Sequence, residues 1–180
     1  LDWVSSVTDL TKGEIINIDG KSLKGSRDKG SKSIVHMVSA WAHANHMVLG
    51  QEKTDEKSNE IKAIPKLLEV LVLKGCMVTI DAMGCQKDIA EKIVSKGGDY
   101  LLAVKGNQGS LEEGVKDTIR FTKPVDENTD VDTGHGRIET RKCSVYHDLS
   151  HIEGLSQWKG LKAIVSIKAE RTIKATGETQ

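Results

Sequence analysis

Residues 15–21 read IINIDGK, and residues 77–84 read MVTIDAMG. Each segment is a short apolar run, rich in β-branched residues, that ends in an aspartate, Asp19 or Asp81. Such runs predict buried strands, the first of them buried on both faces. Two carboxylates at the ends of neighbouring strands would form an oxygen site suited to Mg²⁺ or Mn²⁺. The alternative for each aspartate is a turn or a helix cap.

The composition is that of an ordinary soluble protein with a sizeable core. The 180 residues are 37% apolar and 29% charged. No apolar stretch approaches the roughly 18–20 residues that span a bilayer, and no signal peptide is present, so we expect no membrane partner. The three scattered cysteines and six histidines complete neither a zinc site nor a disulfide framework. These features predict a cytoplasmic protein with reduced thiols.

The order of predicted elements indicates an α/β fold. Periodicity predicts β-β-β-α-β-α-β-α, with apolar residues at helical spacing after residue 60, after residue 88 and after a capping box that begins at Ser110. Three antiparallel strands followed by alternating parallel strands and helices would form a mixed sheet covered by helices. Further along, we expect a polar loop and then two strands. The predicted strands cover residues 15–19, 33–43, 47–53, 77–81, 100–105, 137–147 and 161–171, and the loop covers 126–136.

The predicted domain organisation has three parts. Residues 1–13 form a lead-in segment, residues 14–123 the first part of the main domain, and residues 124–180 an inserted β region. The chain opens without Met and stops in a polar segment, KATGETQ. We therefore expect a fragment of a longer protein, cut before the end of its main domain.

The predicted order, with an aspartate on the first and the fourth strand, resembles the ribonuclease H-like core of nucleases, integrases and DDE transposases. Five local strings go further: IDGKSLKGS, KSNEI, TIDAMGCQ, YLLAVKGNQ and GHGRIETR. In this order they are similar to transposases of the ISAs1 type, which include the H-repeat-associated proteins. The resemblance runs through nearly the whole chain.

The resemblance implies a DNA transposase that cleaves and joins strands with two divalent metal ions, Mg²⁺ or Mn²⁺. Asp19 and Asp81 match the first and second acidic residues of the DDE set. Two ions roughly 3.5–4 Å apart need carboxylates that hold them together. The expected partner is DNA at the transposon ends, and a homodimer would bind these ends.

The third acidic residue is the open part of this set. Glu139 is the candidate within the chain, but a strand would place Arg137 and Arg141 on its face, where they would neutralise it. In the resembled family the last glutamate belongs to a Trp-x-x-Glu-type helix, and none occurs before Gln180. We therefore expect the third ligand beyond the end of this chain and the fragment itself to be inactive.

Basic and polar residues near the aspartates are candidates for DNA contacts. Residues 21–32 carry five basic residues and one acidic residue, although a solvated hairpin loop would look the same. The candidates for phosphate and base contacts are Lys21, Lys24, Lys105, Asn107, Gln108 and Arg137. The alternative for residues 105–109 is a glycine turn.

Two other functions remain compatible with these features. One is an inactive transposase remnant that keeps the fold without catalysis. The other is a stand-alone ribonuclease H-like nuclease, which cuts DNA without strand transfer. A glutamate-bearing helix further along the full-length sequence would favour an enzyme over a remnant.

Overall fold

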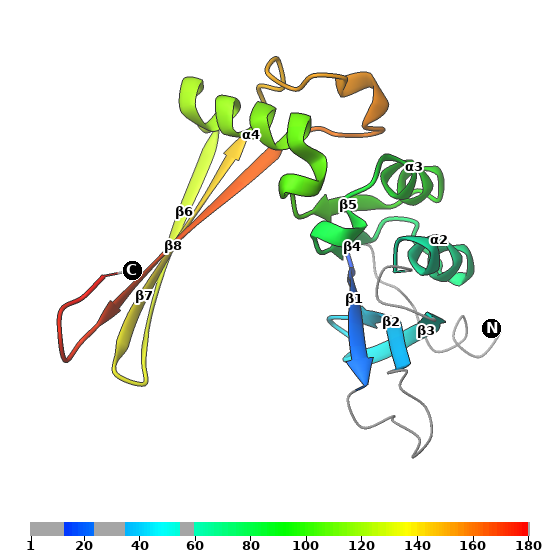
Figure 1. Cartoon of the computed structure of the whole chain (residues 1–180), viewed down its shortest axis with the longest axis horizontal. Coiled ribbons are helices and arrows are strands. Elements are labelled where there is room, and N and C mark those ends of the chain that lie inside the picture. Colours follow the sequence, from blue (N-terminus) through cyan, green and yellow to red (C-terminus); the bar gives the residue numbers. More distant parts are fainter. Residues whose placement is uncertain (1–12, 24–34, 55–59, 180) are drawn as a thin grey trace. The chain divides into compact units, whose positions relative to one another are not determined.

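The computed structural model describes residues 13–23, 35–54 and 60–179, and Figure 1 shows their elements. The chain divides into two compact units, which are described separately. The first comprises residues 1–108 and 156–160, and the second comprises residues 109–155 and 161–180. Residues 109–123, which the sequence assigned to the main domain, thus group with the second unit. The functional division into domains stays a prediction.

The first unit contains a five-stranded sheet in the order β3-β2-β1-β4-β5. The antiparallel part is made of β1, β2 and β3, whereas β4 runs parallel to β1 and β5 parallel to β4. This sheet confirms the predicted ribonuclease H-like α/β fold. The strands cover Ile15–Leu23 (β1), Val35–Ala42 (β2), Met47–Thr54 (β3), Met77–Ile80 (β4) and Asp99–Leu102 (β5).

Strand β1 is buried on one face only, so the prediction of burial on both faces was wrong. Ile16 and Ile18 are 0% and 3% exposed, whereas Ile15 is 40% exposed and Asp19 is exposed. The reason is that successive side chains of a strand point to opposite faces. Trp41 of β2 is 37% exposed, so this large aromatic residue does not belong to the buried core.

Two helices pack against the buried face of the sheet. Helix α2 (Glu60–Val70) and helix α3 (Lys87–Ser95) join one apolar cluster with the sheet. Pro65 lies inside α2, beyond its first turn. Helix α3 ends at a glycine cap, in which Gly97 adopts a φ of +77° and the Gly98 amide donates to the Ile93 carbonyl at 3.1 Å. The cluster includes Ile16, Ile18, Leu67, Leu68, Val78, Ile80, Ile89 and Ile93.

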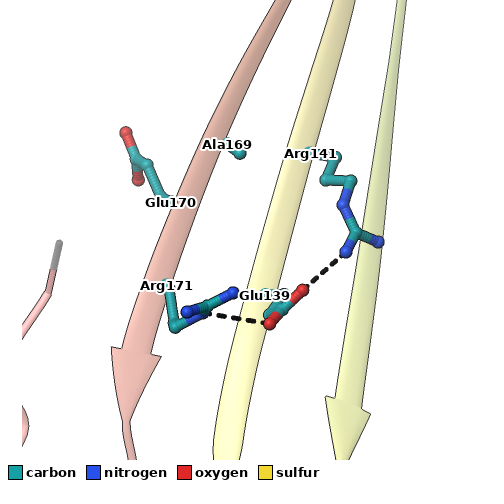
Figure 2. A pocket seen from close by; sticks show the side chains of 5 residues that line it. All are labelled: Glu139, Arg141, Ala169, Glu170 and Arg171. Atoms are coloured by element: carbon teal, nitrogen blue, oxygen red, sulfur yellow. Dashed lines mark hydrogen bonds and ion pairs between the residues drawn. The ribbon is translucent and has the colours of Figure 1, made fainter. Parts of the chain in front are cut away.

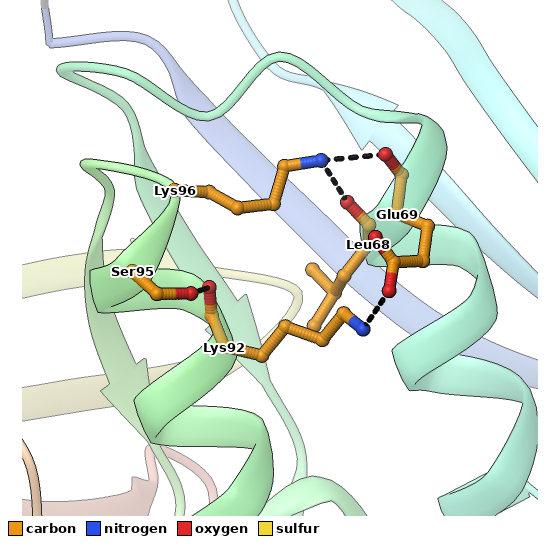
Figure 3. A network of polar contacts seen from close by, with 5 residues as sticks. All are labelled: Leu68, Glu69, Lys92, Ser95 and Lys96. Carbon is orange, nitrogen blue, oxygen red and sulfur yellow. Dashed lines mark hydrogen bonds and ion pairs between the residues drawn. The ribbon is translucent and has the colours of Figure 1, made fainter.

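The C-terminal end of α2 is capped by a lysine from α3's end, as Figure 3 shows. The Lys96 ammonium donates to the main-chain carbonyls of Leu68 and Glu69 at 2.8 and 2.6 Å. Lys92 pairs with the Glu69 carboxylate and lowers the pKa of that exposed group. A cation at this end of a helix satisfies carbonyls that have no partner within the helix.

We predict that Lys96→Met lowers the free energy of unfolding by about 1–2 kcal/mol, since it removes charged hydrogen bonds to two carbonyls. Methionine keeps most of the apolar stem, so the loss reports mainly on the ammonium. Chemical denaturation measures it. Lys62→Met, at an exposed position within the capped helix α2, is the control and should change stability by less than about 0.5 kcal/mol. Equal effects of the two variants would contradict the capping role.

The second unit contains a three-stranded antiparallel sheet in the order β6-β7-β8. Strand β6 (Asp126–Gly134) occupies the segment predicted to be a polar loop, and that prediction was wrong. All nine of its residues are exposed, so no apolar alternation marks it, and its pairing with β7 (Arg137–Tyr146) makes it a strand. Strand β8 covers Ile164–Ile173, two residues beyond the predicted end.

A two-residue turn joins β6 to β7. Gly134 pairs with Arg137, and the two residues between them, His135 and Gly136, have φ angles of +48° and +76°. Positive φ at both central positions is typical of the type I′ turn of tight hairpins. The string GHGRIETR is therefore a hairpin followed by a strand.

Helix α4 (Gly109–Phe121) also belongs to the second unit. It begins one residue before Ser110, which lies in its first turn. The predicted apolar stripe is only partly right, since Leu111 is buried but Ile119 is 37% exposed. The helix buries Gly114 instead, where an added Cβ would lie 2.5 Å from the His151 carbonyl oxygen. The buried face of α4 therefore includes a glycine that lies close to the main chain at His151, and not only the larger apolar residues that we expected there.

Candidate active site

The strand register places Asp19 and Asp81 beside each other. On the parallel strands β1 and β4, Ile18 pairs with Ile80, and an aspartate follows each of them, Asp19 within β1 and Asp81 directly after β4. Neighbouring strands lie about 4.8 Å apart. Asp19 lies within β1, because β1 stays paired with β2 as far as Leu23. The pairing of β1 with β4 ends one residue before Asp19, at Ile18. The first aspartate is thus not at a strand end, as the sequence suggested, but at the end of a parallel pairing.

Both aspartates belong to the face of the sheet opposite the helices. Their preceding residues, Ile18 and Ile80, are 3% and 5% exposed, and alternation then directs the aspartates outward, where both are exposed. One register step earlier on this face, the Thr79 hydroxyl donates to Asn17 Oδ1 at 2.6 Å. Side chains of β1 and β4 on this face are therefore close enough for direct contact.

Asp81 also caps the short turn that follows it. Its Oδ1 accepts a hydrogen bond from the Met83 amide at 3.0 Å, and η2 (Ala82–Gly84) follows. The turn-capping alternative is therefore confirmed for this residue. An ionised carboxylate has two oxygens with about four acceptor positions, so one cap bond leaves room for a cation.

The Cys85 thiol, which directly follows this turn, is buried. Cys85 is 1% exposed, and burial raises the pKa of its thiol to about 11. It is consequently protonated at neutral pH, and metal binding requires the thiolate. The turn offers oxygen ligands, which suit hard divalent cations.

Asn107 and Gln108, predicted to contact DNA, donate hydrogen bonds to this same turn. They lie in η3 (Gly106–Gln108), which follows β5. The Asn107 amide donates to the Ala82 carbonyl at 2.7 Å, and the Gln108 amide donates to the Cys85 carbonyl at 2.9 Å. Residues 106–108 therefore form a turn, as the alternative interpretation of this segment held. The side chains of Asn107 and Gln108 form hydrogen bonds within the chain.

The basic candidates are distributed over both units. Lys21 is exposed on β1 and, two residues after Asp19, lies on the same face of the strand. Lys24 and most of the basic segment lie outside the described residues. Lys105 is exposed just after β5. Arg137 is exposed at the start of β7 in the second unit. Their contacts with DNA stay predictions.

Glu139, the candidate third acid, is engaged in two ion pairs in the second unit. Figure 2 shows its carboxylate between two guanidiniums, with Arg141 Nη2 at 2.5 Å and Arg171 Nε at 3.0 Å. The sequence predicted neutralisation by arginines on the same face. Arg141 is one of them, but the second is Arg171 of β8 and not Arg137, because β8 pairs with β7 opposite Glu139. Among the described residues, no group of three or more His, Cys, Asp or Glu side chains could hold a metal ion.

Glu60 is a buried acid that the sequence did not single out, and it lies against Gly20, the residue that follows Asp19. It is 5% exposed at the first position of α2, and a Cβ added to Gly20 would lie 2.5 Å from its carboxylate carbon. Gly20 follows Asp19, so this close approach explains the glycine of the Asp-Gly pair. The string KSNEI contained Glu60, but nothing in its spacing indicated that the helix start would reach β1.

No helix in the described part of the chain is both long and apolar enough to cross a membrane. This finding concerns residues 13–23, 35–54 and 60–179 only.

Known proteins share this sequence over most of its length. The family described as "Transposase DDE domain" matches residues 10–170. "Putative transposase YncI" of Escherichia coli O157:H7 is 48% identical over 176 residues, which cover 91% of this chain and 44% of that protein. "H repeat-associated putative transposase YhhI" of Escherichia coli (strain K12) is 42% identical over 183 residues, covering 97% of this chain and 48% of that protein.

A solved structure, that of a piggyBac transposase synaptic complex with hairpin DNA, matches with a TM-score of 0.43 and 13% identity, covering 73% of this chain and 30% of that chain. The chain spans about half the length of the curated relatives it matches. Because the family match extends over residues 10–170, the chain belongs to the DDE transposase domain family.

Proposed function

We propose that this chain supplies Asp19 and Asp81 to the active site of a transposase that cleaves DNA strands and joins them at a new position. The observation that supports the proposal is the register of β1 and β4, in which Ile18 pairs with Ile80 directly before the two aspartates, both of which are exposed. The family supports the reaction class. The metal-dependent steps, the site residues and the DNA partner are proposals.

The residues present fit Mg²⁺ or Mn²⁺. The exposed carboxylates of Asp19 and Asp81 are hard oxygen ligands, and the buried Cys85 thiol is held protonated. When bound, divalent ions supply positive charge that stabilises the phosphoryl oxygens during in-line displacement. The chain's own part is to hold the two carboxylates on adjacent strands and to keep Asp81 oriented by its bond to the Met83 amide.

Basic residues would hold the DNA against this site. Lys21 lies on the same face of β1 as Asp19, and Lys105 follows the neighbouring strand β5. Their ammonium groups can pair with backbone phosphates on either side of the reacting one, which positions the strand without reading its sequence. Lys24 and Arg137 belong to the same proposal, as does a pair of protomers acting on two transposon ends.

The test is an assay of the full-length protein on plasmid DNA that carries the transposon ends. We expect nicked and strand-transfer products with Mg²⁺ or Mn²⁺ and none with EDTA. DNA binding without cleavage in either metal would instead identify a remnant. Cleavage without joined products would identify a stand-alone nuclease.

The same assay tests the third acid. Glu139→Gln is expected to retain activity within about threefold, because its carboxylate is already neutralised by Arg141 and Arg171. Glu170→Gln, which removes another ion-paired carboxylate of the same sheet, is the matched control. A loss of tenfold or more for Glu139→Gln alone would make it a metal ligand, since even indirect partners of a metal site cost about 10–100-fold.

A further inference from the structure

The turn that carries Asp81 is a single 3₁₀ turn, to which Gln86 adds a main-chain bond at the Gly84 carbonyl, 2.9 Å, and a long side-chain bond at the Met83 carbonyl, 3.5 Å. Besides the bond from the Met83 amide to Asp81 Oδ1, the Gly84 amide donates to the Asp81 carbonyl at 3.1 Å and the Cys85 amide to the Ala82 carbonyl at 3.3 Å. These are single bonds of a three-residue 3₁₀ turn, in which hydrogen-bond geometry is poorer than in an α-helix. Such a turn alone is a weak support for a catalytic carboxylate.

Two side-chain amides from the next loop hold this turn at both ends. Asn107 donates to the carbonyl of Ala82, directly after Asp81, and Gln108 donates to the carbonyl of Cys85, directly after the turn. Gln108 also donates to the Gln86 side-chain oxygen at 3.2 Å. We call Asn107 and Gln108 the amide clamp. It joins the loops that follow the parallel strands β4 and β5.

The position of the clamp bears directly on Asp81. The Met83 amide, which orients the Asp81 carboxylate, lies between the two clamped carbonyls. If the clamp is lost, the turn gains freedom, and the Met83 amide no longer has one fixed position from which to hold Oδ1. Groups that orient a metal ligand typically change metal affinity about 10–100-fold.

We propose that Asn107 and Gln108 are positioning residues that orient Asp81 for metal binding, and this inference rests on the proposed function. Both side-chain amides donate hydrogen bonds to main-chain carbonyls of the chain itself. Their effect on Asp81 should therefore be measurable without DNA. This differs from the direct DNA contact expected from the sequence, and the two roles predict different results without DNA.

The test uses Asn107→Leu and the double variant Asn107→Ala/Gln108→Ala of the full-length protein. Leucine is close to asparagine in shape and carries neither a donor nor a charge, so this variant removes the bond to Ala82 without adding a possible metal ligand. We expect amide hydrogen exchange in residues 82–86 to accelerate about tenfold, and the affinity for Mn²⁺ alone, without DNA, to fall about tenfold or more. Asn128→Ala, an exposed amide on β6, is the control and should change neither.

Each outcome decides a separate point. Unchanged exchange in residues 82–86 would overturn the clamp, and weaker DNA binding with unchanged Mn²⁺ affinity would make these residues DNA contacts. Faster exchange with unchanged Mn²⁺ affinity would leave the clamp a structural device and overturn its positioning role. If the unaltered protein binds no Mn²⁺, the proposed function fails and the metal part of the inference fails with it, whereas the exchange result still reports on the turn.

Discussion

Asp81→Asn in the full-length protein is expected to reduce DNA cleavage by about 10³-fold. Asparagine keeps the size of the side chain and an oxygen that can accept from the Met83 amide, so the turn is retained while the negative charge is lost. Metal-assisted stabilisation of a transition state amounts to several kcal/mol, and each 1.36 kcal/mol is a factor of ten in rate. Asp19→Asn should have an effect of similar size.

The measurement is the initial rate of plasmid nicking at saturating Mn²⁺, together with the melting temperature of each variant. The double variant Asp19→Asn/Asp81→Asn should be little worse than either single variant, because residues that act as a unit are not additive. Asp88→Asn, which removes an exposed acid from the first turn of α3, is the matched control and should keep the rate. A loss of less than about threefold for Asp81→Asn would contradict the proposed site.

Gly84→Ala is expected to lower the free energy of unfolding by about 1–3 kcal/mol, the usual cost of overpacking a filled core. An added Cβ would lie 2.2 Å from Ile80 Cγ2 and 3.2 Å from Ile64 Cδ1. Ile80 is 5% exposed and β-branched, so it has little freedom to move away. Because Gly84 lies in the turn that Asp81 caps, the shift should also weaken Mn²⁺ binding.

Thermal and chemical denaturation measure the loss of stability. Gly109→Ala is the control, since a Cβ there meets no atom within 4 Å and alanine favours the start of α4. The double variant Ile80→Ala/Gly84→Ala should be less destabilised than the sum of the single variants, because the clash is removed. Additive effects would show that Gly84→Ala acts through something other than Ile80.

The sheet of the first unit was predictable because its residues carry local signals. Apolar runs around Ile16 and Val78 indicate buried strands, the spacing of Leu67 and Leu68 indicates a helix, and consecutive elements tend to be neighbours in the fold. The end of helix α3 is also marked locally, since Gly97 supplies the positive φ that the cap requires.

Strand β6 could not be predicted in the same way. Residues 126–134 are all exposed, so no apolar periodicity marks them as a strand. Their strand conformation depends on pairing with β7, which the turn at His135-Gly136 brings alongside. The second arginine on Glu139 was missed for a related reason. Arg171 is 32 residues away, and only the register of β8 against β7 brings it there.

By itself, the sequence determined the fold class and singled out Asp19 and Asp81 as candidates, because an apolar run that leads into an aspartate is visible in the local pattern. Tertiary structure alone decided which atoms surround them. Asn107 and Gln108 became supports of the Asp81 turn, and Glu60 came to lie against Gly20, since each contact joins segments that are distant in sequence. Pairing and packing between distant segments follow from the whole chain, and no local periodicity encodes them.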